Sequence, residues 1–160
     1  MNRMSNECAL RLLERWRPAL LALCTPELLD TAKQALTELG YKVHTAATHG
    51  DFENRFSQFQ YEVVVIEEFF AANSAEENET LRLLQNMPMN QRRHATVVLL
   101  SQSHQTFHPL QAFQQSVHAV INVAELPLLH QLLEKAVADN TLFLRRFRET
   151  QARASGVKSD

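Results

Sequence analysis

The chain has 160 residues, of which 45% are hydrophobic and 21% are charged, and its formal net charge is −2 at pH 7. This composition is typical of one globular domain and argues against extensive disorder, while the small net charge gives no general reason to expect nucleic acid as a partner. The apolar runs are too short to span a bilayer, no signal-peptide core is present, and two cysteines offer neither a disulfide framework nor a metal set. We therefore expect a cytoplasmic protein that binds no metal and no membrane.

Glycine is scarce, with three residues in the whole chain. A loop that closes its backbone amides around a phosphate group needs several glycines at fixed short spacing. The sequence therefore argues against nucleotide binding through such a loop, and we expect no cofactor.

Buried strands and amphipathic helices alternate along the chain. In chain order the expected elements are a helix over residues 5–17, a strand over 19–24, a helix over 26–39, a strand over 41–46, a helix over 52–59, a strand over 61–66, an acidic loop over 67–78, a helix over 81–87, a strand over 96–100, a helix over 109–117, a strand over 119–123 and a helix from 127 to about 148. Thr25 and Pro26 form a typical helix start. Phe52, Phe56 and Phe59 recur at helical spacing, which indicates the buried stripe of a helix.

Five buried strands that alternate with helices predict parallel βαβ units, because parallel strands need a long crossover connection. Right-handed crossovers with helices on both faces give a doubly wound open sheet, so the expected fold class is α/β. In such sheets the functional crevice lies at the carboxyl ends of the strands. The residues that directly follow each strand are therefore the first candidates for a site.

Three segments carry a resemblance to a known family: residues 19–43 (ALLALCTPELLDTAKQALTELGYKV), 61–68 (YEVVVIEE) and 96–103 (TVVLLSQS). In order and spacing, residues 18–139 resemble the receiver domain of bacterial response regulators. The resemblance implies a flavodoxin-like, five-stranded parallel sheet of strand order 2-1-3-4-5, here with an extra N-terminal helix and a lengthened C-terminal helix. We expect an N-terminal amphipathic helix over 1–17, a receiver-like domain over 18–150 and a disordered tail over 151–160.

Family members take a phosphoryl group on an aspartate after the third strand. An acidic pair after the first strand binds Mg²⁺, a Thr or Ser after the fourth strand contacts the phosphoryl group, and a Lys after the fifth strand pairs with it. In this chain the aspartate position falls on Glu67, and the acidic pair falls on Leu23 and Cys24. The hydroxyl position falls on Ser101, and the lysine position falls on Asn122 or Val123.

These replacements remove the charges on which phosphoryl transfer depends. Mg²⁺ prefers carboxylate oxygens, which neither Leu23 nor Cys24 offers, and Asn122 carries no charge to replace the lysine. Glu67 is a carboxylate, but its longer side chain would place the oxygens about 1.5 Å too far out for a site built around aspartate. The resemblance therefore implies an atypical receiver, not an enzyme, that is not phosphorylated in the usual way and binds another protein.

Three alternatives stay open at this stage. Glu67 could accept a phosphoryl group itself, or Glu67 and Glu68 could mimic the phosphorylated state. Between mimicry and simple solvation of both acids at a strand end, we favour solvation. A small-ligand sensor or enzyme would place a cavity beside Cys24 and Ser101, with Cys24 as the only candidate nucleophile. His104 and His108 lie four residues apart, but Pro109 begins a helix after them, so we interpret both as loop histidines.

The final helix overruns the usual end of a receiver domain, and an apolar stripe that does so must be buried elsewhere. The stripe could be buried in a homodimer through the last helix, or the N-terminal helix could pack against it within one chain. The arginines beside it argue for a solvated face rather than a nucleic-acid site, because no exposed aromatic residues alternate with them. The predicted interaction surface consists of Leu12, Trp16, Val120, Phe143, Leu144 and Phe147.

Overall fold

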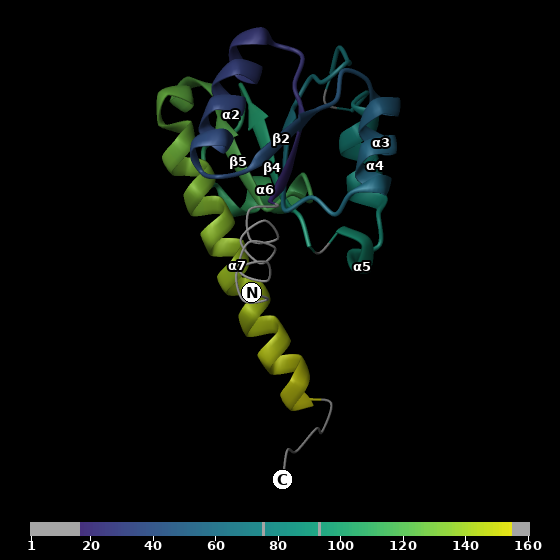
Figure 1. Ribbon diagram of the computed structural model, residues 1–160, viewed down its shortest axis with the longest axis vertical. Coiled ribbons are helices and arrows are strands. Elements are labelled where there is room, and N and C mark those ends of the chain that lie inside the picture. The colour runs from purple at the N-terminus through teal and green to yellow at the C-terminus, as the bar shows by residue number, and fades with distance from the viewer. Residues whose placement is uncertain (1–16, 75, 93, 155–160) are drawn as a thin grey trace, which may run out of the picture.

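The computed structural model describes residues 17–74, 76–92 and 94–154 (Figure 1). The helix predicted over residues 5–17, with its surface residues Leu12 and Trp16, lies outside this part of the chain except for Arg17. Five parallel strands form one sheet of order β2-β1-β3-β4-β5, which is the predicted topology. The strands are β1 (Pro18–Ala22), β2 (Lys42–Thr45), β3 (Val63–Glu67), β4 (Thr96–Ser101) and β5 (Ala119–Asn122).

Helices connect successive strands and follow the last one. They are α2 (Pro26–Glu38), α3 (His49–Gln58), α4 (Glu79–Asn86), the short α5 (Met89–Arg92), α6 (Pro109–Gln114), the 3-10 segment η1 (Val123–Leu128) and α7 (Leu129–Ala154). The pattern of apolar residues did not predict α5, which is a single turn after Pro88. It also assigned residues 127–128 to the last helix, whereas they complete η1, which contains Pro127.

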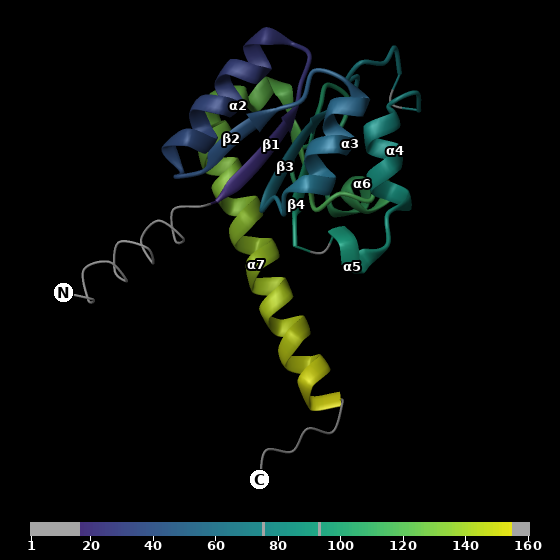
Figure 2. The same ribbon diagram turned by 45° about the vertical axis from the view of Figure 1, so that its right-hand side comes forward.

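Alternate residues of each buried strand face opposite helix layers, because side chains project to opposite faces along a strand. On one face, Leu21, Val65 and Leu100 pack with α2 and α7. On the other, Leu20 and Ile66 pack with residues from α3, α4 and α6. Figure 2 shows the sheet between these layers, with α2 and α7 on one side and α3 and α4 on the other. This sandwich is the doubly wound arrangement that the sequence predicts.

The predicted aromatic stripe is buried over only part of its length. Phe52 is fully buried and Phe56 is 9% exposed, and the two rings stack at 5.5 Å between centroids. Phe59 is 38% exposed because α3 ends at Gln58, and its backbone is extended. The expectation of one continuous buried stripe was therefore wrong at its last position.

Helix α7 has two parts that differ in their contacts. Leu129, Leu133, Ala136 and Asn140 are buried against the sheet layer, and Asn140 Nδ2 donates a hydrogen bond of 2.8 Å to Thr96 Oγ1 of β4. Beyond Asn140 the helix runs out past the edge of the sheet (Figures 1 and 2), and we call residues 141–154 the α7 extension. It is helical through Ala154, so residues 151–154 are not the disordered tail that was predicted. None of the described helices combines the length and the apolar content that a membrane span requires.

Candidate functional site

The carboxyl ends of β1, β3, β4 and β5 meet at one edge of the sheet, as expected for parallel strands. Four of the predicted positions lie there in a group: Cys24, Glu67, Ser101 and Asn122. Register explains their meeting, because Glu67 of β3 lies opposite Leu100 of β4, and Ser101 lies opposite Asn122 of β5.

Glu67 turns its carboxylate toward the start of α2. Its Oε2 accepts hydrogen bonds from the backbone N–H groups of Cys24 at 2.7 Å and Thr25 at 3.1 Å, and Thr25 Oγ1 donates to Oε1. Cys24 and Thr25 directly precede Pro26, the first residue of α2, so their amides lie at the positive end of the helix dipole, which stabilises an anion. Both oxygens of Glu67 are thus engaged by the chain itself.

The two residues at the acidic-pair positions differ in exposure. Leu23 is 4% exposed and belongs to the core beneath α2, so it contributes only packing. Cys24 is exposed, and its Sγ accepts a hydrogen bond of 3.2 Å from the N–H of Ala71. Ala71 lies in the loop after β3 and adopts a left-handed backbone conformation with a φ of 48°.

Glu68 points the other way from Glu67 and lies in a polar cluster with Ser101, Ser103 and His104. It is 6% exposed, and Ser101, 1% exposed, donates from Oγ to Glu68 Oε2 at 2.6 Å. His104 Nδ1 lies 2.6 Å from Ser101 Oγ and 3.7 Å from Glu68 Oε1. The N–H groups of Ser103 and His104 also donate to Ser101 Oγ, at 3.1 and 3.2 Å. The interpretation of both acids as solvated was therefore wrong for Glu68.

Asn122 is the last residue of β5, and Val123 begins η1. Asn122 Nδ2 donates to the carbonyl oxygen of His104 at 2.8 Å and, more weakly, to that of Gln102 at 3.4 Å. Its Oδ1 accepts from the N–H of Ala124 at 2.9 Å, which caps the start of η1. The Asn122 side chain thus holds the loop after β4, and it brings no charged group to the site.

Asn78 is a site residue that the sequence did not single out. It is fully buried, and its Nδ2 donates to the carbonyl oxygens of Glu67 at 3.0 Å and Glu68 at 3.1 Å. Its Oδ1 accepts from Leu81 N–H at 3.1 Å, which caps α4. Asn78 therefore joins the end of β3 to the start of α4. An Asn three residues before the first core leucine of a helix is the signal that could have found it.

His108 was predicted to be a loop histidine, and Val120 was predicted to belong to an interaction surface. His108 is the N-cap of α6, where its Nδ1 accepts from Gln111 N–H at 3.3 Å. Val120 is fully buried between β4 and the helix layer of α3, α4 and α6, so its inclusion in an exposed interaction surface was wrong. Phe143 and Phe147 lie on the α7 extension and are 63% and 36% exposed. Leu144, on the same extension, is half-buried.

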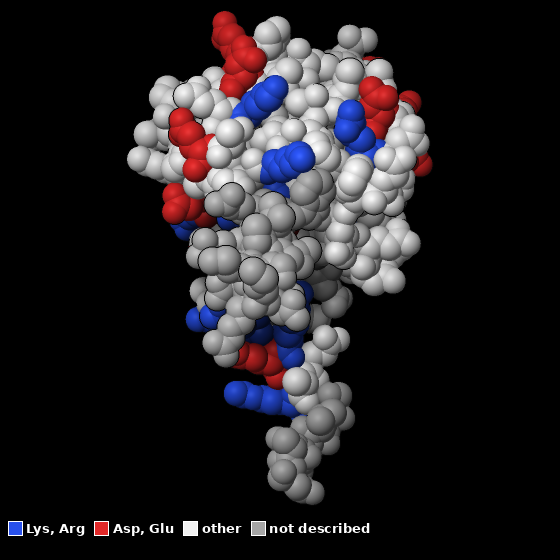
Figure 3. Space-filling model, in the orientation of Figure 1, with Lys and Arg blue, Asp and Glu red and all other residues white. Residues whose placement is uncertain are grey.

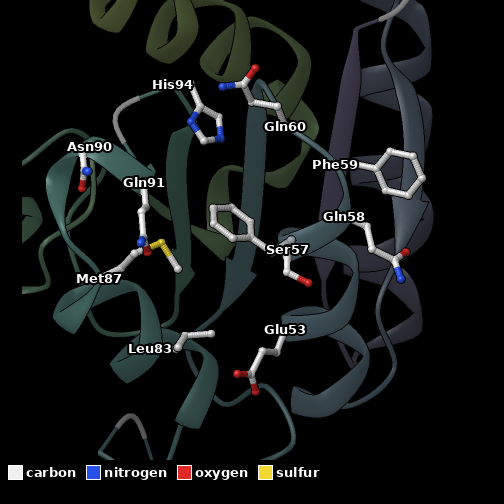
Figure 4. A pocket seen from close by; sticks show the side chains of 11 residues that line it. Glu53, Ser57, Gln58, Phe59, Gln60, Leu83, Met87, Asn90, Gln91 and His94 are labelled. Atoms are coloured by element: carbon white, nitrogen blue, oxygen red, sulfur yellow. The ribbon is translucent and has the colours of Figure 1, made fainter.

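A groove of about 660 Å³ lies between α3 and the α4–α5 segment (Figure 4). Phe56 and His94 are among the residues that line it, and their rings stack at 6.2 Å between centroids. Burial lowers the pKa of the His94 ring. Neither Cys24 nor Ser101 lines this groove, so it is not the strand-end cavity that a small-ligand sensor was expected to have.

No family model and no curated protein matches the chain. Among solved structures, NtrX from Brucella abortus superposes with a TM-score of 0.64 at 15% identity and covers 91% of this chain, which spans 31% of the NtrX chain. The chemotaxis response regulator CheY4 of Vibrio cholerae gives 0.58 at 12% identity over 76% of this chain and 98% of its own. A CheY-like receiver domain protein from Methanospirillum hungatei JF-1 gives 0.60 at 15% over 79% and 97%.

The class defined by the sheet order and its helix layers is the doubly wound α/β domain. The fold within that class is the CheY-like receiver fold of response regulators, with a long C-terminal helix.

The receiver fold implies a Mg²⁺ site at the strand ends, and the residues present do not fit one. Leu23 is an aliphatic core residue, and the thiol of Cys24 is a soft ligand that Mg²⁺ disfavours. Glu67 is held by α2, and Glu68 is held by Ser101. Within residues 17–74, 76–92 and 94–154, no three His, Cys, Asp or Glu side chains gather in a way that could hold a metal ion.

Proposed function

We propose that this protein is an atypical receiver-like signalling domain that is not phosphorylated in the usual way and acts, without catalysis, by binding another protein. The observation that carries the proposal is the hydrogen bonding of Glu67 to Cys24 and Thr25. A carboxylate that accepts a phosphoryl group must present a free oxygen to it, and here both oxygens of Glu67 already accept hydrogen bonds, Oε2 from Cys24 and Thr25 and Oε1 from Thr25.

The absence of counter-charge supports the same proposal. A transferring phosphoryl group develops negative charge that a metal ion and a cation neutralise, which contributes several kcal/mol. At the family's metal and lysine positions this chain has Leu23, Cys24 and Asn122. The Ser101 hydroxyl, which could still contact a phosphoryl group, is buried and donates to Glu68.

An amide NMR titration with Mg²⁺ and then beryllium fluoride, a mimic of the phosphoryl group, tests this proposal. We expect the amides of Cys24, Glu67 and Ser101 to keep their positions in both steps, while a phosphorylatable receiver domain run in parallel responds to both. Shifts of these amides with Mg²⁺, followed by further shifts with the mimic, would show a working phosphorylation switch and overturn the proposal.

The interaction surface that we propose is the face made by α6, the edge strand β5 and α7. Two large apolar side chains of α6 are exposed there, Leu110 at 58% and Phe113 at 80%, and Phe143 is exposed where α7 leaves the sheet. A hollow of about 220 Å³ that Phe107 and Phe143 help to line lies along the edge of β5. Exposed apolar groups gathered on one face mark interaction sites more often than scattered ones do.

The partner on this face is a protein, either a second copy or another chain. Light scattering after size-exclusion chromatography, on the wild type and on Phe113→Glu, decides between them. A dimer that Phe113→Glu converts to a monomer identifies the second copy. A wild type that is already monomeric directs the search to other chains, with Phe113→Glu as the matched negative control in the binding assay.

A further inference from the structure

The feature that carries a further inference is a groove at the base of the α7 extension. It has a volume of about 670 Å³ and lies where the described chain begins. One wall is the entry to β1, with Arg17 and Pro18, and the opposite wall is α7, with Val137, Leu144 and Arg148. A smaller hollow of about 140 Å³ lies on the other side of Leu144.

We propose that residues 5–16 of the same chain dock along the α7 extension and fill this groove. The groove lies beside the point at which residues 5–16 join the described part of the chain. Residue 16 is bonded directly to Arg17, which forms part of the wall, so the preceding residues start at the mouth of the groove. A tether this short gives the docking segment an effective concentration on the order of millimolar, which a second molecule does not reach at ordinary protein concentrations.

Residues 5–16 also fit the α7 extension in chain direction and in length. Strand β1 begins at the sheet edge from which α7 departs (Figure 2). A segment that ends at residue 16 can therefore run beside the α7 extension in the opposite direction. Residues 5–16 would span about 18 Å as a helix, and the fourteen residues of the α7 extension span about 21 Å. The two lengths match, so the segment can cover nearly the whole α7 extension.

The side chains of residues 5–16 are chemically suited to the groove and to the α7 extension. The docking segment contributes Leu12, Leu13 and Trp16, which suit a groove whose α7 wall includes Val137 and Leu144. The α7 extension carries four arginines and one glutamate within residues 145–153, a net charge of +3. Two such extensions placed side by side would repel each other, whereas the docking segment has a net charge of zero, because its carboxylates Glu7 and Glu14 are balanced by Arg11 and Arg15. Figure 3 shows Lys and Arg side chains on the lower part of the molecule.

Trp16 is the only tryptophan of the chain, so its fluorescence reports on this docking directly. In the full chain we expect emission shifted to the blue and weak quenching by acrylamide, because the indole is shielded by the groove. In Leu144→Asp we expect a red shift and quenching that approaches that of the urea-unfolded chain, since a carboxylate would then stand in the groove wall.

Leu142→Asp is the matched control, because Leu142 is 46% exposed and lies about 200° around the helix from Leu144. We expect its emission and quenching to equal those of the wild type. Circular dichroism on both variants shows whether the domain stays folded. Equal quenching of Trp16 in the wild type and in the unfolded chain would overturn the proposal.

Dilution separates docking within one chain from docking between two. A blue-shifted emission that persists on dilution, together with a monomeric mass in light scattering, supports docking within the chain. A blue shift that is lost on dilution in parallel with a dimeric mass would identify a second copy as the occupant and overturn the proposal. The inference does not rest on the lost phosphoryl chemistry, so the Mg²⁺ titration and the Trp16 measurement succeed or fail separately.

Discussion

At the scale of single residues, the site is defined by which way two adjacent carboxylates point. Successive side chains of a strand face opposite ways, so Glu67 reaches α2 while Glu68 reaches Ser101 of β4. Each carboxylate is satisfied by groups of the chain itself. The two acids therefore contribute to stability separately and do not form an acid–base pair.

Replacing Glu67 by Gln tests its role at the start of α2. The neutral amide loses the attraction between a carboxylate and the amides of Cys24 and Thr25, so we expect the free energy of unfolding to fall by about 1–2 kcal/mol. Urea denaturation at neutral pH measures the change. Glu62→Gln is the control, because the Arg17–Glu62 ion pair is exposed and should contribute less than about 1 kcal/mol. An unchanged midpoint for Glu67→Gln would show that α2 does not depend on this carboxylate.

His118 couples stability to pH. Burial and the positive charge of Arg92 lower the pKa of the ring to about 4, and although the residue is partly exposed, its Nδ1 accepts a hydrogen bond of 2.9 Å from Val97 N–H. In the unfolded chain a histidine titrates near about 6.5, so between these pH values the unfolded state binds a proton that the folded state does not. We therefore expect the free energy of unfolding to fall as the pH is lowered through this window.

The variant His118→Asn keeps a hydrogen-bond acceptor near Val97 and removes the titration. Urea denaturation at a series of pH values should then show a shallower loss of stability between about pH 6.5 and 4 than in the wild type. Parallel curves for the two proteins across that range would contradict the assignment.

At the scale of elements, the loop after β3 is fixed by one buried amide side chain. Asn78 joins the end of β3 to the start of α4 through three hydrogen bonds. Asn78→Ala leaves two carbonyl oxygens and one N–H without this partner, so we expect a loss of about 2–3 kcal/mol in the free energy of unfolding. Chemical denaturation measures it, with the exposed Asn86→Ala as control. A loss no larger than that of the control would mean that the loop is held by its other contacts.

The elements were more predictable from sequence than the site. Most strands were predicted from apolar runs such as 63–66 and 97–100, because burial of a strand on both faces requires such runs. The second strand was predicted from the alternating pattern of residues 41–46, and the strand order was implied by the resemblance to receiver domains. The pairing of Glu68 with Ser101 could not be predicted, because it depends on the register between β3 and β4 and on the rotamers of both residues. Val120 was misplaced for a related reason, since its burial depends on which helix layer covers that face of β5.

At the scale of the whole molecule, stability is distributed unevenly along α7. Leu129, Leu133, Ala136 and Asn140 anchor its first half on the sheet, while the α7 extension runs beyond the sheet edge (Figure 1). We expect amides of the first half to exchange hydrogen only on global unfolding, and those of residues 145–154 to exchange sooner through local opening. Hydrogen exchange followed by NMR or mass spectrometry measures the gradient. Uniform protection along α7 would show that the α7 extension is held as firmly as the anchored half.

The hydrogen bonds between Glu67 and α2 have a consequence for how such a protein could be controlled in a cell. An ordinary switch holds two states whose ratio an enzyme resets within seconds, so its output can change while its amount stays constant. Under the proposed function, a domain whose acidic side chain is bound by the amides of Cys24 and Thr25 has a single setting. The amount of partner that it binds would then depend on the amount of the protein itself. The cell would adjust this binding through synthesis and degradation of the protein.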